Sequence, residues 1–312
     1  MQKIGDILLL RNHEIDRAKW DACIGRADNG LIYARSFYLD TMSEHWDALV
    51  LGNYETVMPL TWNKKLTIRY LYQPPFTACL GIFGKDLNAN VIDGFLAAIP
   101  VSFRFADIAL NHANFSQTSA GMRTRNNFVL QLNQSYENLQ AGYSENHRRN
   151  LAKSAQSRLH LTDVSLDVAI SLNASTMKDR APLPAGAYGR LKKLVNLAQE
   201  KNSVKIFGVR DENSAVLAAA VFLFDGRRAY YILAGNDPGG RNTGASHALV
   251  DGFIQQHAGQ DLALDFEGSD VESIARFYKG FGAESEPYPA LYYNRLPWPI
   301  RWMKPLKPDT FR

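Results

Sequence analysis

The sequence has few cysteines and no long apolar run. Cys23 and Cys79 are the only cysteines in 312 residues, so the chain can assemble neither a disulfide framework nor a thiolate metal site. No stretch approaches the roughly 18 apolar residues that a membrane span needs. The apolar run Ile7–Leu10 is too short for the core of a signal peptide. We therefore expect a cytoplasmic protein without a membrane span.

Several catalytic and metal-binding motifs are also missing. The sequence has no Gly-x-Ser-x-Gly element and no recognisable Cys–His pairing, which leaves hydrolase chemistry without support. His247 and His257 lie on one expected helix at a spacing that does not let them chelate a metal together. The sequence thus predicts no metal site.

Charge and size give a modest signal. The length fits about two domains, and 46% hydrophobic residues can supply a core for each. A net charge of +4 does not indicate a DNA-binding protein. Between His147 and His160, however, the chain is locally basic and carries no acid. The basic residues there are Arg148, Arg149, Lys153 and Arg158. Such a face suits a phosphate-rich ligand, although it is also typical of a solvated helix surface.

Both halves of the chain show the same coarse order of helices, antiparallel meander, helix and strand. In the second half, the stretches 204–210, 215–224 and 228–234 read as strands separated by turn residues. In the first half, Ala48–Gly52 and Glu55–Trp62 read as a hairpin. This order predicts an α/β fold with mixed sheets in two domains, 1–143 and 144–312.

A glycine-rich loop precedes an expected helix, Gly244–His257. The orphan N–H groups of a helix N-terminus bind anions, and glycine lets the backbone approach the anion closely. No Lys-Ser/Thr pair closes the loop, so it is not a Walker loop, and it lacks the Gly-x-Gly-x-x-Gly pattern. We predict a pyrophosphate site here, although such a turn can also be purely structural. Its residues are Gly239, Gly240, Arg241, Asn242, Thr243, Gly244, Ala245 and Ser246.

This loop resembles the pyrophosphate loop of GNAT acyltransferases, whose pattern is Gln/Arg-x-x-Gly-x-Gly/Ala. The corresponding residues are Arg241, Gly244 and Ser246, and the serine departs from the small apolar residue of the family. The preceding meander and the following helix and strand stand in the family's order. The resemblance implies acyl-CoA as a co-substrate and no permanently bound cofactor.

Three further segments resemble the Fem-type aminoacyl and peptidyl transferases, which are methicillin resistance protein-like members of the GNAT superfamily. They are Asn146-His-Arg-Arg-Asn-Leu151, Asp237-Pro-Gly-Gly-Arg241 and Leu264-Asp-Phe-Glu-Gly-Ser269 with Ile274-Ala-Arg-Phe-Tyr-Lys-Gly-Phe-Gly-Ala283. The resemblance implies two tandem GNAT-like domains, side by side with a cleft between them. This sequence differs from the family pattern Phe-Lys-x-x-Phe-Gly at the lysine, since Tyr278 occupies that position and Lys279 comes one residue later.

The candidate catalytic residues follow the last predicted strand. Asp265 and Glu267 alternate along it, so both are expected on one face, with Gly268 leaving room for a substrate. One of them could orient or deprotonate an acceptor amine, or it could instead cap the helix expected near Asp270. Tyr278 and Lys279 complete the predicted catalytic set.

Three functions remain open at this stage. The chain could transfer an acyl group from a thioester to a small-molecule or peptide amine. It could be a Fem-type transferase of cell-wall peptide synthesis that uses aminoacyl-tRNA. It could also be a non-catalytic relative that only binds a ligand, which the substitutions at Ser246 and Tyr278 favour.

Overall fold

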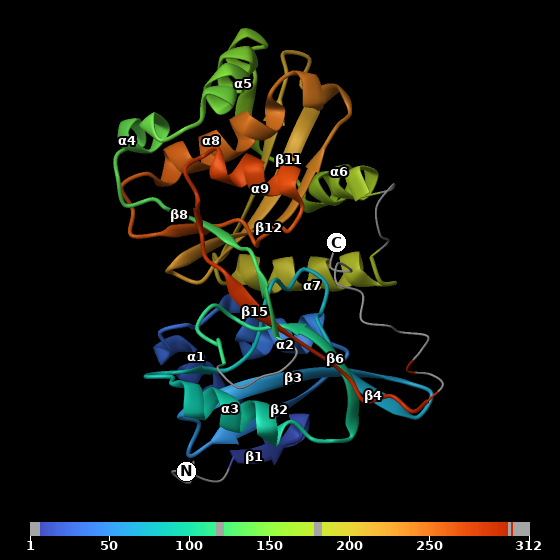
Figure 1. The fold of residues 1–312 in the computed structure, drawn as a ribbon. Helices are drawn as coiled ribbons and strands as arrows, with labels where there is room; N and C mark the ends of the chain where they lie inside the picture. Colours follow the sequence, from blue (N-terminus) through green and yellow to red (C-terminus); the bar gives the residue numbers. More distant parts are fainter. Residues whose placement is uncertain (1–6, 117–121, 178–182, 299–300, 302–312) are drawn as a thin grey trace. The chain divides into compact units, whose positions relative to one another are not determined.

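The computed structural model describes residues 7–116, 122–177, 183–298 and 301, which fall into two compact units, each built around its own sheet (Figure 1). Unit 1 comprises the described residues of 1–125 and 287–311, and unit 2 comprises residues 126–286. The division therefore lies before the expected one at residue 143. The physical reason is strand pairing, since residues 128–131 pair within the second sheet and residues 288–294 return to the first.

Unit 1 has an eight-stranded sheet of order β1-β2-β3-β4-β6-β15-β7, with β5 paired to β3. Its strands are β1 (Ile7–Leu10), β2 (His45–Leu51), β3 (Thr56–Lys65), β4 (Ile68–Tyr72), β5 (Phe83–Gly84), β6 (Phe103–Ala109), β7 (Met122–Arg125) and β15 (Tyr288–Asn294). Its helices are η1 (Asn12–Glu14), α1 (Arg17–Arg26), η2 (Ile32–Ala34), α2 (Ser36–Met42) and α3 (Ala89–Ala98).

Unit 2 has a seven-stranded sheet of order β14-β8-β13-β12-β11-β10-β9. Its strands are β8 (Phe128–Gln131), β9 (His160–Asp163), β10 (Val204–Arg210), β11 (Val216–Phe224), β12 (Arg228–Asn236), β13 (Ala263–Asp265) and β14 (Glu284–Ser285). Its helices are α4 (Tyr136–Ala141), α5 (Glu145–Gln156), α6 (Leu166–Met177), α7 (Ala187–Glu200), η3 (Gly239–Asn242), α8 (Ala245–His257) and α9 (Glu272–Lys279).

The predicted mixed sheets are confirmed, and the two units share one strand pattern. In each, a three-strand antiparallel meander is followed by a helix and by a strand that pairs in parallel with the third strand of the meander. The parallel pairs are β4 with β6 and β12 with β13. The same order of elements in both halves, expected from the sequence, is therefore present in the fold.

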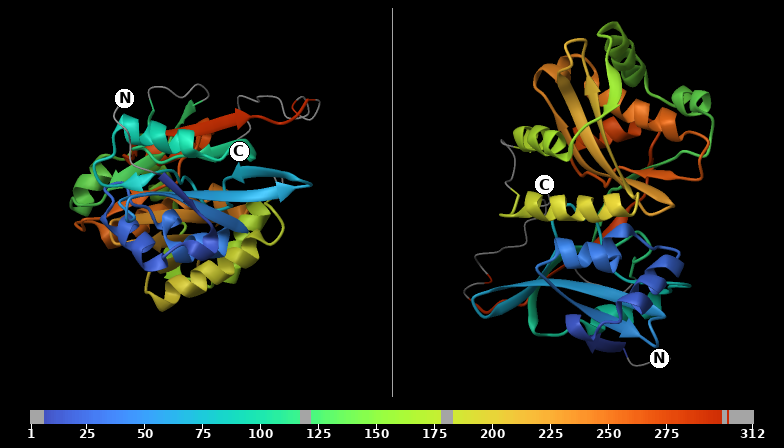
Figure 2. Two further views of the ribbon diagram at one scale, coloured as in Figure 1. Left: turned by 90° about the horizontal axis from the view of Figure 1, so that it is seen from below. Right: turned by 180° about the vertical axis from the view of Figure 1, so that it is seen from behind.

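The core of unit 2 lies between the sheet and the helices α8 and α9. Leu249 and Phe253 of α8 are buried, as the helical spacing of apolar residues predicts. The Phe253 ring stacks on Phe222 of β11 at a centroid distance of 4.0 Å. Helices α6 and α7 pack against β10 to β12 from the other side (Figure 2). This packing fixes the first turn of α8 relative to the sheet.

The parallel pairing of β12 with β13 is short. It joins Arg228–Tyr230 to Ala263–Asp265, where β13 ends, and β12 then continues to Asn236. An irregularity in the pairing with β11 leaves Ile232 as an extra residue in β12. Beyond it, α6 hydrogen-bonds to the strand, with Asn173 Nδ2 donating to the Ala234 carbonyl oxygen at 2.7 Å. The second half of β12 therefore extends past the end of β13.

Gly235 lets α6 approach β12, and a larger residue there should destabilise unit 2. A Cβ on Gly235 would lie 2.2 Å from the Asn173 backbone nitrogen and 2.3 Å from the Leu172 carbonyl carbon. We expect Gly235→Ala to lower the free energy of unfolding by about 2 kcal/mol, the usual scale of overpacking. Urea denaturation checks this. The control Gly189→Ala, at a helical glycine with nothing within 4 Å, should be neutral or stabilising. Equal midpoints for both variants would contradict the packing argument.

Candidate functional site

A pocket of about 710 Å³ lies in unit 2 among α5, α8 and α9. Residues from the basic helix, from the helix after the glycine loop and from the Fem-like closing segment meet there. Its lining comprises Ser144, Asn146, His147, His247, Ser273, Arg276, Phe277, Lys279 and Gly280. The structure thus brings together three segments that the sequence analysis singled out separately.

His147 forms the floor of this pocket and is 2% exposed. Its Nε2 lies 2.8 Å from the Phe277 carbonyl oxygen, and its Nδ1 lies 2.9 Å from Ser144 Oγ. A Cβ on Gly280 would lie 2.0 Å from the imidazole, so the ring packs directly on the glycine backbone. The Ser144 N–H also donates to the Gly280 carbonyl oxygen at 2.9 Å. The start of α5 is therefore fixed to the end of α9.

His247, in the first turn of α8, packs edge-on against His147 at a centroid distance of 4.6 Å. Burial, together with a smaller contribution from the neighbouring His147, lowers the pKa of His247 to about 4. Burial also lowers the pKa of His147, opposed by its hydrogen bond to Phe277. Both rings are neutral at pH 7. The sequence analysis missed this pair because the two histidines come from different helices.

The rim of the pocket carries the positive charge. The Arg276 guanidinium is 2.7 Å from the Glu272 carboxylate, but both side chains are largely exposed, so this pair holds Arg276 weakly. Lys279 Nζ lies 5.4 Å from the centre of the Phe128 ring. The first turn of α5 adds its N-terminal dipole, which also favours anions. The arrangement favours a ligand that carries phosphate or another anion.

The glycines of the predicted pyrophosphate loop are required by contacts within the protein. Gly244 has a φ of 78°, and a Cβ there would lie 2.4 Å from the Asn150 carbonyl oxygen of α5. A Cβ on Gly240 would lie 2.5 Å from the Leu217 carbonyl oxygen. A bulky residue at Gly244 would therefore also disturb the packing of α5, which agrees with the structural role that the sequence left open for this turn.

The other residues of the predicted loop fall into η3 and the start of α8. Thr243 Oγ1 donates to the Gly240 carbonyl oxygen at 2.9 Å, and Ser246 Oγ donates to Asn236 Oδ1 at 2.7 Å. Ser246 thus connects the loop to the end of β12. Gly239, Asn242 and Ala245 complete the turn, whereas the side chain of Arg241 lies outside the described part.

Asp265 lies in a buried cluster of charges. Its carboxylate accepts hydrogen bonds from Arg228 at 2.8 Å and from Asn127 Nδ2 at 3.0 Å. Arg228 also donates twice to Glu286, at 2.9 and 2.7 Å. Burial raises the pKa of Asp265, and the Arg228 guanidinium opposes that rise. Asp265 thereby connects β13 with β12 and with the segment after β14.

Glu267 does not share a strand face with Asp265, contrary to the alternation expected from the sequence. The strand β13 ends at Asp265, and Glu267 has a left-handed φ of 61°. The Glu267 N–H donates to Asp265 Oδ1 at 2.9 Å. Helix α9 begins after Val271 without a side-chain cap, so neither carboxylate caps it. Glu267 instead lies just after the carboxyl end of β13.

The two candidate residues on α9 lie in different surroundings. The Tyr278 ring stacks on Phe266 at 4.5 Å and packs against the core of unit 2. Lys279, one residue later, lines the pocket. Of the four predicted catalytic residues, therefore, only Lys279 lines it.

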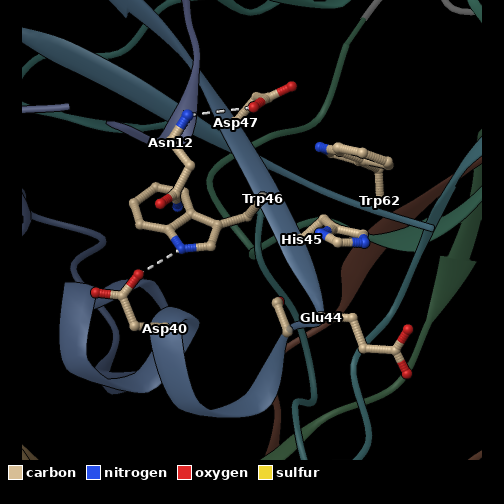
Figure 3. Close-up of a pocket in the computed structure, with 8 residues that line it drawn as sticks. Asn12, Asp40, Glu44, His45, Trp46, Asp47 and Trp62 are labelled. Atoms are coloured by element: carbon tan, nitrogen blue, oxygen red, sulfur yellow. Dashed lines mark hydrogen bonds between the residues drawn. The ribbon is translucent and has the colours of Figure 1, made fainter. Parts of the chain in front are cut away.

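A second, smaller pocket of about 220 Å³ lies in unit 1 (Figure 3). Three carboxylates line it, from Asp40, Glu44 and Asp47. Figure 3 shows Asp40 accepting a hydrogen bond from Trp46 Nε1 and Asp47 accepting one from the backbone of Asn12. This acidic lining disfavours a phosphate-bearing ligand, which is better suited to the pocket of unit 2.

The structure also limits other site classes. No helix within the described ranges is long and apolar enough to cross a membrane. In the same residues, no group of three or more His, Cys, Asp or Glu side chains is arranged to hold a metal ion.

The fold is that of tandem GNAT-like domains, and it confirms at this level the resemblance seen in the motifs. Similar solved structures include FemX, with a TM-score of 0.63, 12% identity and coverage of 93% of this chain and 98% of that chain. The C-terminal domain of a lysylphosphatidylglycerol synthetase from Agrobacterium fabrum has a TM-score of 0.55 and 12% identity, with coverage of 92% of this chain and 94% of that chain. A tandem GNAT protein from the clavulanic acid biosynthesis pathway has a TM-score of 0.50 and 10% identity, with coverage of 94% of this chain and 99% of that chain. No family model and no curated protein matches the sequence.

The histidine pair predicts a loss of stability at acidic pH. Because His247 keeps a pKa of about 4 in the folded unit, against 6.5 for an ordinary histidine, the unfolded chain binds protons first as the pH falls. Its stabilising contribution is complete above about pH 6.5 and is lost between about pH 6.5 and 4. We expect His247→Phe, which keeps an aromatic ring beside Phe277, to reduce the loss between pH 7 and 5 by about 1 kcal/mol. Urea midpoints at the two pH values measure it, and identical losses in both proteins would contradict this origin.

Proposed function

We propose that this protein is an acyltransferase and that unit 2 moves an acyl or aminoacyl group from an activated, phosphate-bearing donor to an amine. The observation that carries the proposal is the single pocket that joins the first turn of α8 to the cations of α9 and to the start of α5. Acyl-CoA, whose pyrophosphate suits Arg276 and Lys279, is the proposed co-substrate. No permanently bound cofactor is needed for this reaction.

The irregular pairing of β12 supports this chemistry. The extra residue Ile232 turns part of the β12 backbone out of its regular pairing. Backbone N–H groups held in place in this way can stabilise the charge that develops on a carbonyl oxygen during acyl transfer. Glu267 follows the carboxyl end of β13, the parallel neighbour of β12, and a carboxylate there can orient or deprotonate an amine.

An aminoacyl-tRNA donor is the second candidate, with a small molecule or a peptide as the acceptor. The basic helix α5 favours it, since Arg149 and Lys153 are exposed on that helix. Arg148 is less available, because its Nε donates to the Tyr143 carbonyl oxygen at 3.0 Å. The names FemX and lysylphosphatidylglycerol synthetase of two similar structures agree with aminoacyl transfer. A purely ligand-binding role is favoured by Tyr278, which packs in the core where the Fem-type pattern has lysine.

The donor pocket predicts a specific loss of affinity. We expect the double variant Arg276→Ala/Lys279→Ala to weaken the binding of acetyl-CoA and of free coenzyme A by about 10- to 100-fold, since two charge-assisted contacts are lost. Isothermal titration calorimetry measures it. The control Lys205→Ala removes an exposed cation from β10 and should change nothing. Unchanged affinity in the double variant, or binding of aminoacyl-tRNA alone, would reject the coenzyme A site.

The acceptor side predicts a loss of turnover without a loss of donor binding. Glu267→Gln keeps the shape of the side chain and removes the charge that would orient the amine, so turnover should fall by about 10²-fold. Donor affinity should not change, because Glu267 is not among the residues that line the pocket. Steady-state rates with an amine acceptor test this. Full activity in the variant would mean that the charge of Glu267 is not needed and that transfer relies on the positioning of the substrates alone.

A further inference from the structure

Ser144 and His147 have the geometry of an activated nucleophile. We propose that Ser144 Oγ accepts the acyl group from the donor and that His147 acts as its general base. The inference rests on the proposed function in one respect only, namely that the donor binds in the same pocket. A serine nucleophile needs a base within hydrogen-bond reach and a third group that orients the base. Ser144, His147 and the Phe277 carbonyl supply these parts, at 2.9 and 2.8 Å.

The hydrogen bonds fix which nitrogen of His147 carries the proton. The Phe277 carbonyl oxygen can only accept, so His147 Nε2 must be protonated. In the neutral ring, Nδ1 is then an acceptor, and the Ser144 hydroxyl donates to it. Burial lowers the pKa of His147 and keeps this neutral form at pH 7. The base is therefore unprotonated on the side that faces the serine.

The ring of His147 is held rigidly while Ser144 remains accessible. Gly280, His247 and Phe281 enclose the imidazole, with Phe281 at a centroid distance of 4.4 Å. Ser144, by contrast, is exposed and lines the pocket. This combination of a fixed base and an open hydroxyl is what a nucleophile requires.

The start of α5 can also stabilise the negative charge of the reaction. Ser144 is the N-cap, and the first helical hydrogen bonds are donated by His147 and Arg148 to its carbonyl oxygen. The N–H groups of Glu145 and Asn146 belong to the first turn, which has no intrahelical acceptors. They lie next to Ser144, where an oxyanion would form.

The reaction balances with the donor alone. The proton of the Ser144 hydroxyl moves to His147 Nδ1 as Oγ bonds to the donor carbonyl carbon. The bond from that carbon to the donor's thiolate or alkoxide breaks, and the leaving group takes the proton from Nδ1. The acceptor amine then attacks the serine ester, its proton passes through His147 back to Oγ, and the amide is released.

Labelling with p-nitrophenyl acetate tests the proposal without knowledge of the natural donor. We expect one acetyl group per protein, located on Ser144 by peptide mass spectrometry, with a burst of nitrophenol. Ser144→Asn and Ser144→Gly retain good N-cap residues, so they should keep the fold and lose the label. Ser135→Ala, at the N-cap of α4, removes a second exposed capping serine and should label normally.

The variant His147→Gln tests for a role beyond helix capping, because a residue that only caps the helix should not affect the rate at which Ser144 is acetylated. If His147 is the base, the labelling rate should fall by about 10²-fold while Ser144 remains present. Labelling of the Ser144 variants at the normal rate, or no label on the unmodified protein, would overturn the inference. Failure of coenzyme A to bind by calorimetry, with Ser144 still acetylated, would count against the proposed donor and leave this inference standing.

Discussion

The pocket of unit 2 depends on the contact between the start of α5 and the end of α9. Two hydrogen bonds make this contact, from the Ser144 N–H to Gly280 and between His147 Nε2 and the Phe277 carbonyl oxygen. Both use carbonyl groups of the last turn of α9, which have no partners within the helix itself. The imidazole fits only because Gly280 has no side chain. This contact brings the end of α9 to the place where α5 packs against α8.

This contact also determines the electrostatics of the pocket. The neutral histidines, of which His147 is buried and His247 half-buried, line its interior, and the exposed cations Arg276 and Lys279 lie at its rim. In the proposed complex, the rim would hold a phosphate-bearing donor while the acyl group reaches the uncharged histidines. Charged interactions at such a rim contribute modestly and are weakened by salt, whereas groups in the interior act in a lower dielectric. In the proposed reaction, donor binding and chemistry would therefore use different parts of one pocket.

Local patterns in the sequence predicted much of unit 2. The helical spacing of Leu249 and Phe253 and the turns of the meander identified the elements that surround the site. Contacts between distant residues could not be predicted in this way. The bond from His147 to Phe277 spans 130 positions, and that from Arg228 to Asp265 spans 37.

Two local expectations failed for identifiable reasons. Asp265 and Glu267 do not alternate on one strand, because Glu267 adopts a left-handed conformation. That conformation is uncommon for glutamate, so the sequence does not predict it. The observed boundary between the units differs from the expected one because β8 and β15 pair with strands that are distant in the sequence. Ser144 could have been considered from its spacing to His147, but the same spacing is equally typical of a helix cap.

Hydrogen–deuterium exchange of the full-length protein, with and without saturating acetyl-CoA, tests the central claim most directly. Slower exchange is predicted in three segments that are far apart in the sequence, 144–151, 244–250 and 272–280, because residues of all three line the pocket proposed to bind the donor. The Lys205→Ala control should show the same protection. Protection confined to unit 1, or to one of these segments alone, would contradict the account.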